Sequence, residues 1–93
     1  MIKSFADKEA EKIYRGEASR KLPPDIQKTA RRKLLYLDNA DGLADLRAVP
    51  GHHLEALHGK RAGQYSIRVN DQRRICFHWV TNNAHNVEIV DYH

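Results

Sequence analysis

The chain has 93 residues, a formal net charge of +4 at pH 7 and an apolar fraction of 41%. A chain of this length forms one domain, residues 1–93, and has no room for a separate cofactor domain. No apolar run approaches the roughly 18 residues of a membrane span, and the N-terminus lacks the apolar stretch of a signal peptide. These features predict a cytoplasmic protein with no membrane contact.

The charges are unevenly distributed along the chain. Residues 1–33 contain ten Lys or Arg and five acids, residues 34–59 one and four, and residues 60–93 five and three. Two basic regions flanking an acidic middle suit a polyanion or an acidic protein partner, although a solvated surface explains the pattern equally well. The single cysteine, Cys76, excludes an intrachain disulfide and a Cys-rich zinc site, and its apolar neighbours predict a buried structural thiol.

Helical patterns occupy the first half of the chain. Residues 2–5 could form a short edge strand, and Ser4 with Asp7 resembles a variant capping box that opens a helix ending at Gly16. The polar segment from Gly16 to Lys21 is predicted to be mobile.

A second helix is predicted to start at Pro23-Pro24-Asp25 and to end at Asp41-Gly42. Its apolar stripe, spaced four, four and three residues apart, consists of Ile26, Ala30, Leu34 and Leu37. A short helical turn should follow over Leu43 to Val49, and Pro50-Gly51 should break the chain before a sheet.

Strand patterns occupy the second half. The expected strands run near His53 to Leu57, from Gln64 to Asn70, from Arg74 to Val80 and, after a turn at Asn82-Asn83, from Asn86 to Asp91. A three-residue loop, Asp71-Gln72-Arg73, would pair Val69 with Ile75, Ile67 with Phe77 and Tyr65 with Trp79. The predicted fold is therefore α+β, with two N-terminal helices packed on one face of a small, mainly antiparallel sheet.

The other face of this sheet would be polar. The predicted register sets Arg68 beside Cys76, Asn70 beside Arg74 and Ser66 beside His78. Arginines that converge from neighbouring strands favour an anion site, because the guanidinium fork matches a phosphate. Salt bridges to Glu55, Glu88 or Asp91 would explain the same arginines without any ligand.

Cleavage of an RNA phosphodiester fits such a site without any metal. The 2′-OH attacks the adjacent phosphorus, so the protein supplies a base, an acid and positive charge. Arg68 and Arg74 suit the last role, and proton transfer could involve His93, Tyr92, Asp91 or Glu55. A metal or other cofactor is not expected: the histidines have no recognisable ligand spacing, and no glycine-rich phosphate loop is present.

Motifs along nearly the whole chain resemble one known family. They include Pro50-Gly51, Leu54-Glu55-Ala56-Leu57, Arg61-Ala62-Gly63-Gln64, Ser66-Ile67-Arg68-Val69-Asn70-Asp71, Arg74-Ile75-Cys76-Phe77 and Val87-Glu88-Ile89-Val90-Asp91-Tyr92-His93. This pattern resembles the HigB branch of the RelE-like toxins. The resemblance implies a microbial-ribonuclease-like fold and the toxin of a type II toxin–antitoxin pair. It also implies a metal-independent endoribonuclease that cuts translated mRNA in the ribosomal A site, typically at adenine-rich codons.

The resemblance also implies partners and roles for individual residues. The partner would be a HigA-like helix-turn-helix antitoxin, and operator DNA would be bound only through the toxin–antitoxin complex. Asp91, Tyr92 and His93 match the family's catalytic triplet, and Arg68 and Arg74 match the arginines that hold the scissile phosphate. Glu55 stands where some relatives have a catalytic histidine, which leaves the general base open.

Contacts to RNA or the ribosome are expected from a further set of basic residues, namely Lys60, Arg61, Arg73, Lys28, Arg31 and Arg32. The helical members of this set could instead receive an acidic antitoxin segment. The alternative to a nuclease is a catalytically weakened module of the same fold that acts with its antitoxin as an operator co-repressor.

Overall fold

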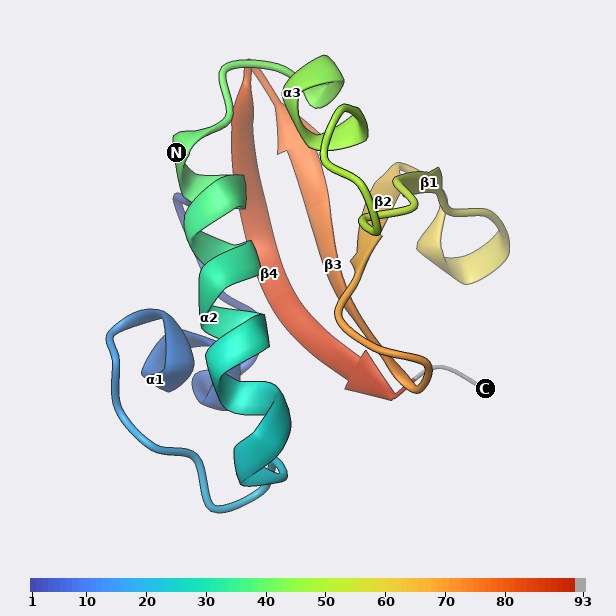
Figure 1. Ribbon diagram of the computed structural model, residues 1–93. Coiled ribbons are helices and arrows are strands. Elements are labelled where there is room, and N and C mark those ends of the chain that lie inside the picture. Colours follow the sequence, from blue (N-terminus) through green and yellow to red (C-terminus); the bar gives the residue numbers. More distant parts are fainter. Residues whose placement is uncertain (92–93) are drawn as a thin grey trace.

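Helices and strands occupy separate halves of the chain in the computed structural model, which describes residues 1–91. The helices are α1 (Lys8–Tyr14), α2 (Pro24–Asn39) and α3 (Leu43–Arg47). The strands are β1 (Glu55–Ala56), β2 (Gln64–Arg68), β3 (Arg73–Val80) and β4 (Asn83–Asp91). They form an antiparallel sheet in the order β1-β2-β3-β4, and α1 and α2 lie on one face of it (Figure 1). The predicted α+β class is confirmed.

The long helix α2 forms where the sequence predicts it. Pro24 occupies the first turn, where its missing N–H costs no helical bond. All four residues of the predicted apolar stripe are buried and belong to the core, at exposures between 0 and 6%. Burying side chains of this kind contributes about 1.5–3 kcal/mol each for the leucines and the isoleucine. A fifth buried residue on this helix, Lys33, was not predicted.

The start of α1 differs from the prediction. Asp7, not Ser4, caps the helix, since its carboxylate accepts a hydrogen bond from the backbone N of Glu9 at 2.9 Å. Ser4 cannot begin a helix because the segment around it pairs with β4: Ile2 bridges Ala84 in a parallel arrangement, and Phe5 bridges Val87 in the same way. The predicted edge strand is thus present as two isolated bridges, and the capping box is absent.

The segment between α1 and α2 is anchored at Ser19, which is buried. Ser19 Oγ donates to Glu9 Oε1 at 2.6 Å, and the backbone N of Ser19 donates to Gln27 Oε1 at 3.0 Å. The amide of Gln27 in turn donates to the carbonyl of Ser19 at 2.9 Å. These contacts fix the middle of a segment that the sequence predicts to be mobile.

The β2–β3 register differs from the prediction by two residues. Ile67 lies opposite Ile75, and Tyr65 lies opposite Phe77. The connecting loop is longer than three residues, because β2 ends at Arg68 and Asn70 Oδ1 accepts hydrogen bonds from the backbone of residues 72 and 73. Side chains alternate with a period of two, so a shift of two residues leaves every side chain on its predicted face.

Strand β4 is longer than predicted and contains a bulge. It begins at Asn83 instead of Asn86, and the preceding turn uses Thr81 and Asn82 with φ of 49° and 61°. Asn86, with φ of 53°, lies where the pairing with β3 shifts by one residue. The bulge lets β4 continue from the turn to Asp91.

The core lies between α2 and one face of the sheet, with Phe77 as its largest fully buried side chain. The opposite face is not uniformly exposed, since Ser66 and Cys76 at its centre are fully buried as well. Within residues 1–91, no helix is both long and apolar enough to cross a membrane.

Candidate functional site

Two arginines lie directly opposite each other on neighbouring strands. Arg68 ends β2, Arg74 lies at the start of β3, and the two form a cross-strand pair. The Cβ atoms of such a pair lie about 4.5–5.5 Å apart, so the observed register brings the two cations closer than the predicted one. Like charges opposite each other destabilise a sheet unless an anion compensates them.

Arg74 is held in place by protein acceptors. Its Nε donates to Ser66 Oγ at 2.7 Å, and its Nη2 donates to the carbonyl of His53 at 2.5 Å. Nη2 also lies 3.8 Å from Glu55 Oε1. The side chain is 11% exposed, so its guanidinium is oriented before any ligand arrives.

Arg68 is fixed through its backbone and is more accessible at its side chain. Its N donates to the carbonyl of His52 at 2.7 Å, and its carbonyl accepts from Lys33 Nζ at 2.6 Å. Its guanidinium pairs with the exposed carboxylate of Asp71. An exposed ion pair is worth at most about 1 kcal/mol, so a phosphate could displace Asp71 at little cost.

The carboxylate candidates lie at different places. Glu55 on β1 pairs with Ser66 on β2 and contacts Arg74, while its side chain is 56% exposed. Asp91 ends β4 opposite Arg73, at the start of β3. The structure therefore gathers Arg68, Arg74 and Glu55 in one cluster. Tyr92 and His93, the other two members of the predicted triplet, lie outside the described residues.

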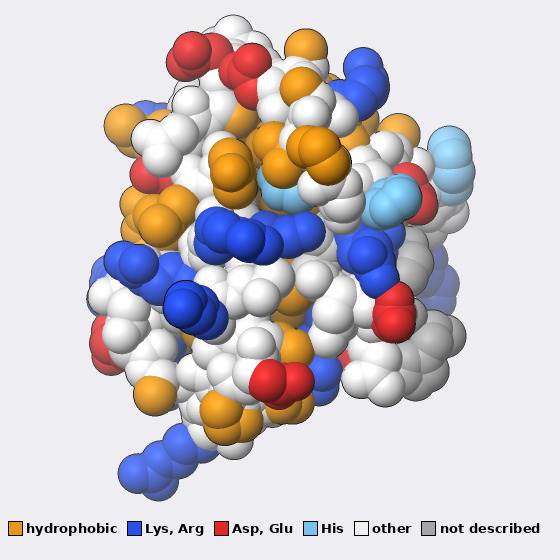
Figure 2. Space-filling model, in the orientation of Figure 1, with side chains coloured by type: hydrophobic (Ala, Val, Ile, Leu, Met, Phe, Trp, Pro, Cys, Tyr) orange, Lys and Arg blue, Asp and Glu red, His pale blue; other side chains and the backbone are white. Residues whose placement is uncertain are grey.

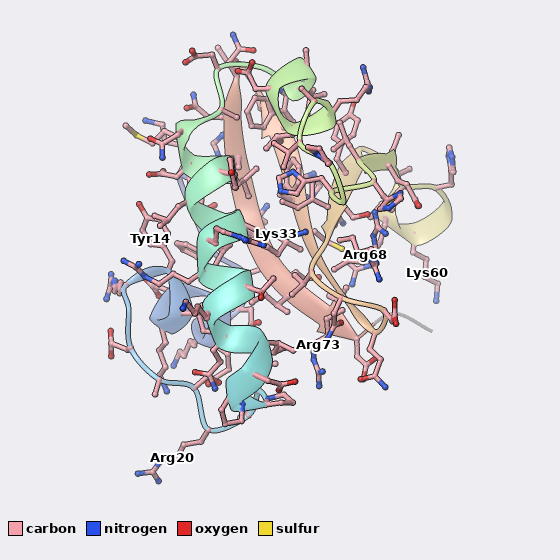
Figure 3. The ribbon with its side chains drawn as sticks, in the orientation of Figure 1. Tyr14, Arg20, Lys33, Lys60, Arg68 and Arg73 are labelled. Atoms are coloured by element: carbon pink, nitrogen blue, oxygen red, sulfur yellow. The ribbon has the colours of Figure 1, made fainter. Side chains whose placement is uncertain are left out.

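The cations predicted to contact RNA fall into two groups. On α2, Lys28, Arg31 and Arg32 are exposed along the outer face. Lys60, in the 3₁₀ helix η1 (Gly59–Arg61), lies on the far side of β2 from α2, and Arg73 lies near the end of β4 (Figure 3).

Arg61, the neighbour of Lys60, forms contacts within the fold. Its Nη1 lies 2.7 Å from Glu88 Oε1 on β4 and donates to Gln64 Oε1 at 3.1 Å. This bridge ties η1 to the sheet.

Two buried groups beside the arginines were not predicted as site residues. Lys33 is 7% exposed and points from α2 toward Arg68 (Figure 3), and His52 is fully buried. The position of Lys33, three residues after Ala30 and four before Leu37, places it on the buried side of the helix. That spacing could have indicated its burial, whereas nothing in the sequence marks His52.

Cys76 is buried as predicted. Burial raises the pKa of its thiol, and the carboxylate of Glu88 adds to the effect, while Arg61 and Arg74 oppose it. A raised pKa disfavours the thiolate form that a nucleophile needs. Within residues 1–91, no three His, Cys, Asp or Glu side chains are grouped so that they could hold a metal ion.

Comparison with known proteins identifies solved structures that share the fold. The solved structures that resemble the chain include two YoeB–YefM toxin–antitoxin complexes from Staphylococcus aureus, with TM-scores of 0.62 and 0.58. Each match has 18% sequence identity and covers 100% of this chain and 98% of the other, and so shows a shared fold.

Relatives in sequence identify the class of protein more closely than the fold does. Toxin HigB-1 of Vibrio cholerae serotype O1 is 41% identical over 87 residues, 92% of each chain. An uncharacterized protein of Haemophilus influenzae is 34% identical over 84 residues, 89% of this chain and 83% of its own. The family model for HigB-like toxins, described as the RelE-like toxin of the type II toxin–antitoxin system HigB, matches residues 3–93.

The fold and the sequence relatives thus define a RelE-like toxin of a type II toxin–antitoxin system. Within that class, the chain belongs to the HigB-like toxin family.

Proposed function

We propose that this protein is an endoribonuclease that cuts translated mRNA in the ribosomal A site, at adenine-rich codons, without a metal. The observation that carries the proposal is the opposed pair Arg68 and Arg74, with Glu55 3.8 Å from the second guanidinium. In such a cluster the arginines supply positive charge that binds a phosphate, and the carboxylate can accept a proton during the reaction.

In the proposed reaction the ribose 2′-OH loses a proton and its oxygen bonds to the adjacent phosphorus. The bond from phosphorus to the 5′-oxygen breaks, and that oxygen takes up a proton. Arg68 and Arg74 stabilise the charge that grows on the phosphoryl oxygens. Glu55 is our candidate base. His93 is our candidate acid, because histidine titrates near neutral pH, with Asp91 and Tyr92 beside it in the sequence.

Binding partners follow from the same proposal. Lys60, Arg61 and Arg73, together with Lys28, Arg31 and Arg32 on α2, would contact RNA of the message or the ribosome through phosphates. A helix-turn-helix antitoxin of the HigA type would neutralise the toxin, and the complex would bind operator DNA. The YoeB–YefM complexes support an antitoxin partner for a toxin of this fold.

Expression in a bacterium, followed by mapping of mRNA 5′ ends, tests the activity. We expect new ends inside reading frames at adenine-rich codons, and none in a reporter without a start codon. Arg68→Ala and His93→Ala should each lower cleavage about 10²–10³-fold, the usual cost of losing a group that stabilises the transition state. Lys8→Ala, an exposed change on α1, should cleave as the wild type does. Growth arrest with uncut transcripts would contradict the proposal.

One observation favours a second function. Arg74 already donates to Ser66 and His53, and weak activity would follow if these contacts kept it from a phosphate. The protein would then act with its antitoxin as an operator co-repressor. Normal growth under strong expression, together with a stable antitoxin complex on operator DNA, would support this function against the first.

A further inference from the structure

Lys33 is a buried cation among other cations. Its ammonium donates to the carbonyl of Arg68 at 2.6 Å, and no carboxylate of residues 1–91 forms an ion pair with it. Burial lowers the pKa of Lys33, and the positive charges of Arg32, Arg68 and Arg74 lower it further. A buried charge without an opposite partner is costly. An anion placed beside Lys33 would therefore be bound favourably.

His52 provides an unused acceptor next to this cation. Its ring is fully buried, and Nδ1 lies 3.2 Å from the carbonyl of Leu46. A neutral imidazole whose Nδ1 donates to a carbonyl has a bare lone pair on Nε2. That Nε2 is buried and has no hydrogen-bond partner among residues 1–91, which costs about 1–3 kcal/mol.

Lys33 and His52 both line a cavity of about 240 Å³. It lies between α2 and the segment before β1, and its lining residues are Arg32, Lys33, Tyr36, Val49, Pro50 and His52. The volume exceeds that of several water molecules, at about 30 Å³ each in the liquid. We call it the Lys33–His52 pocket.

The pocket adjoins the arginine cluster. Lys33 lines the pocket and donates to the carbonyl of Arg68, so the pocket lies next to the cluster of Arg68, Arg74 and Glu55. In Figure 2, Lys and Arg side chains form a band across the middle of this face, with histidines beside it. Tyr36 is 46% exposed, and its ring meets that of His52 edge-on at 5.4 Å.

We propose that the Lys33–His52 pocket is a second RNA subsite, which binds the nucleotide next to the scissile phosphate. Lys33 and Arg32 hold its phosphate, Tyr36 offers a ring on which a base can stack, and His52 Nε2 accepts from a ribose hydroxyl or from water held by the ligand. Only a ligand with an anion, a hydroxyl and a flat ring uses all of these groups. The inference rests on the proposed function, because it assigns the pocket to the same RNA.

Nuclear magnetic resonance with the free protein tests the subsite without any cleavage. Adenosine 3′-monophosphate, added up to millimolar concentration, should shift the His52 ring signals and the Lys33 side-chain signals together and saturably. The bound phosphate should also raise the pKa of Lys33, because it favours the charged ammonium. Inorganic phosphate should bind at least about tenfold more weakly, since it lacks the ring and the hydroxyl.

Variants separate the subsite from general charge attraction. Lys33→Met should weaken nucleotide binding about tenfold or more, as expected for loss of a charged hydrogen bond. Lys8→Met removes an exposed charge on α1 and should bind as the wild type does. If Lys33→Met does not fold, the wild-type titration decides the question alone.

Three results would overturn the subsite. The Lys33 and His52 signals could stay unchanged, inorganic phosphate could bind as tightly as the nucleotide, or an acidic peptide could shift these signals when the nucleotide does not. None of them bears on cleavage, which is mapped separately. RNA cutting by a protein with an unresponsive pocket would remove the subsite and leave the proposed function intact.

Discussion

At the scale of single residues, the arrangement of the two arginines depends on a few buried polar contacts. Ser66 is fully buried and its Oγ accepts from Arg74 Nε, while the carbonyl of His52 accepts from the backbone N of Arg68. Hydrogen bonds to charged groups contribute about 1.5–3 kcal/mol each, enough to hold a guanidinium in one orientation. The guanidinium of Arg74 is therefore oriented before any ligand binds, as the proposed electrostatic catalysis requires.

His52 should make stability depend on pH in a window of its own. Burial lowers its pKa below the ordinary 6.5, and the charges of Lys33 and Arg32 add to this, while the contact with Leu46 opposes it. At a pH between 6.5 and the lowered pKa of the folded protein, His52 is protonated in the unfolded chain but neutral in the folded one. The contribution of neutral His52 to the free energy of unfolding is therefore complete above pH 6.5 and is lost as the pH falls through this window. The loss is at most about 1.4 kcal/mol per pH unit.

Thermal melts from pH 7 to pH 5 check this effect. His52→Gln should have a flatter profile than the wild type, whereas His58→Gln, at an exposed position, should keep the wild-type slope. Equal slopes for the wild type and His52→Gln would refute the assignment.

At the scale of elements, the bulge in β4 connects the N-terminal segment to the sheet. The backbone N of Asn86 donates to Ser4 Oγ at 2.9 Å, and its φ of 53° lies in the left-handed region. Asparagine and glycine tolerate that region, whereas a β-branched side chain does not.

Asn86→Val should therefore lower the free energy of unfolding by about 1–2 kcal/mol. Asn86→Gly is the matched control and should change it little, because glycine adopts positive φ readily and keeps the same backbone donor. Urea denaturation of both variants measures the difference. If valine and glycine prove equally stable here, the left-handed backbone at residue 86 is not the constraint that we describe.

The elements also show which features a sequence can predict. The buried stripe of α2 was predicted because its spacing is local. The predicted β2–β3 register was wrong by two residues. A shift of two residues keeps each side chain on the same face, so the pattern cannot distinguish the two registers. The Ser4 capping box was wrong because Ile2 and Phe5 pair with β4, a partner more than 80 residues away.

In the candidate site too, local motifs could be predicted, whereas contacts between distant segments could not. Arg68, Arg74 and Glu55 could be named from motifs, and the structure brings them together. The pairing of Arg61 with Glu88 and the burial of His52 depend on distant segments, and sequence pattern contains no information on them. The catalytic roles of these residues stay predictions.

At the scale of the whole molecule, Asp38 near the end of α2 joins three parts of the chain. Its Oδ1 accepts from the backbone N of Ile2 at 2.8 Å, and its Oδ2 accepts from the hydroxyl of Tyr14 at 3.0 Å. The N-terminal segment, α1 and α2 thus meet at one carboxylate, and the N-terminal segment lies beside β4. Loss of that carboxylate should loosen contacts that are distant in sequence.

Asp38→Ala should lower the free energy of unfolding by about 1–3 kcal/mol, because two donors lose their acceptor.

The hydrogen bond to Asp38 is also the main cause of the raised pKa of Tyr14, with burial and the negative charge adding to it. A raised tyrosine pKa stabilises the fold below pH 10 and stops doing so as the pH rises through the folded value. In Asp38→Ala the pKa of Tyr14 should therefore fall toward its ordinary 10.0. Absorbance titration, with Tyr14→Phe identifying the signal, measures this fall, and an unchanged Tyr14 titration in Asp38→Ala would show that the carboxylate does not join α1 to α2.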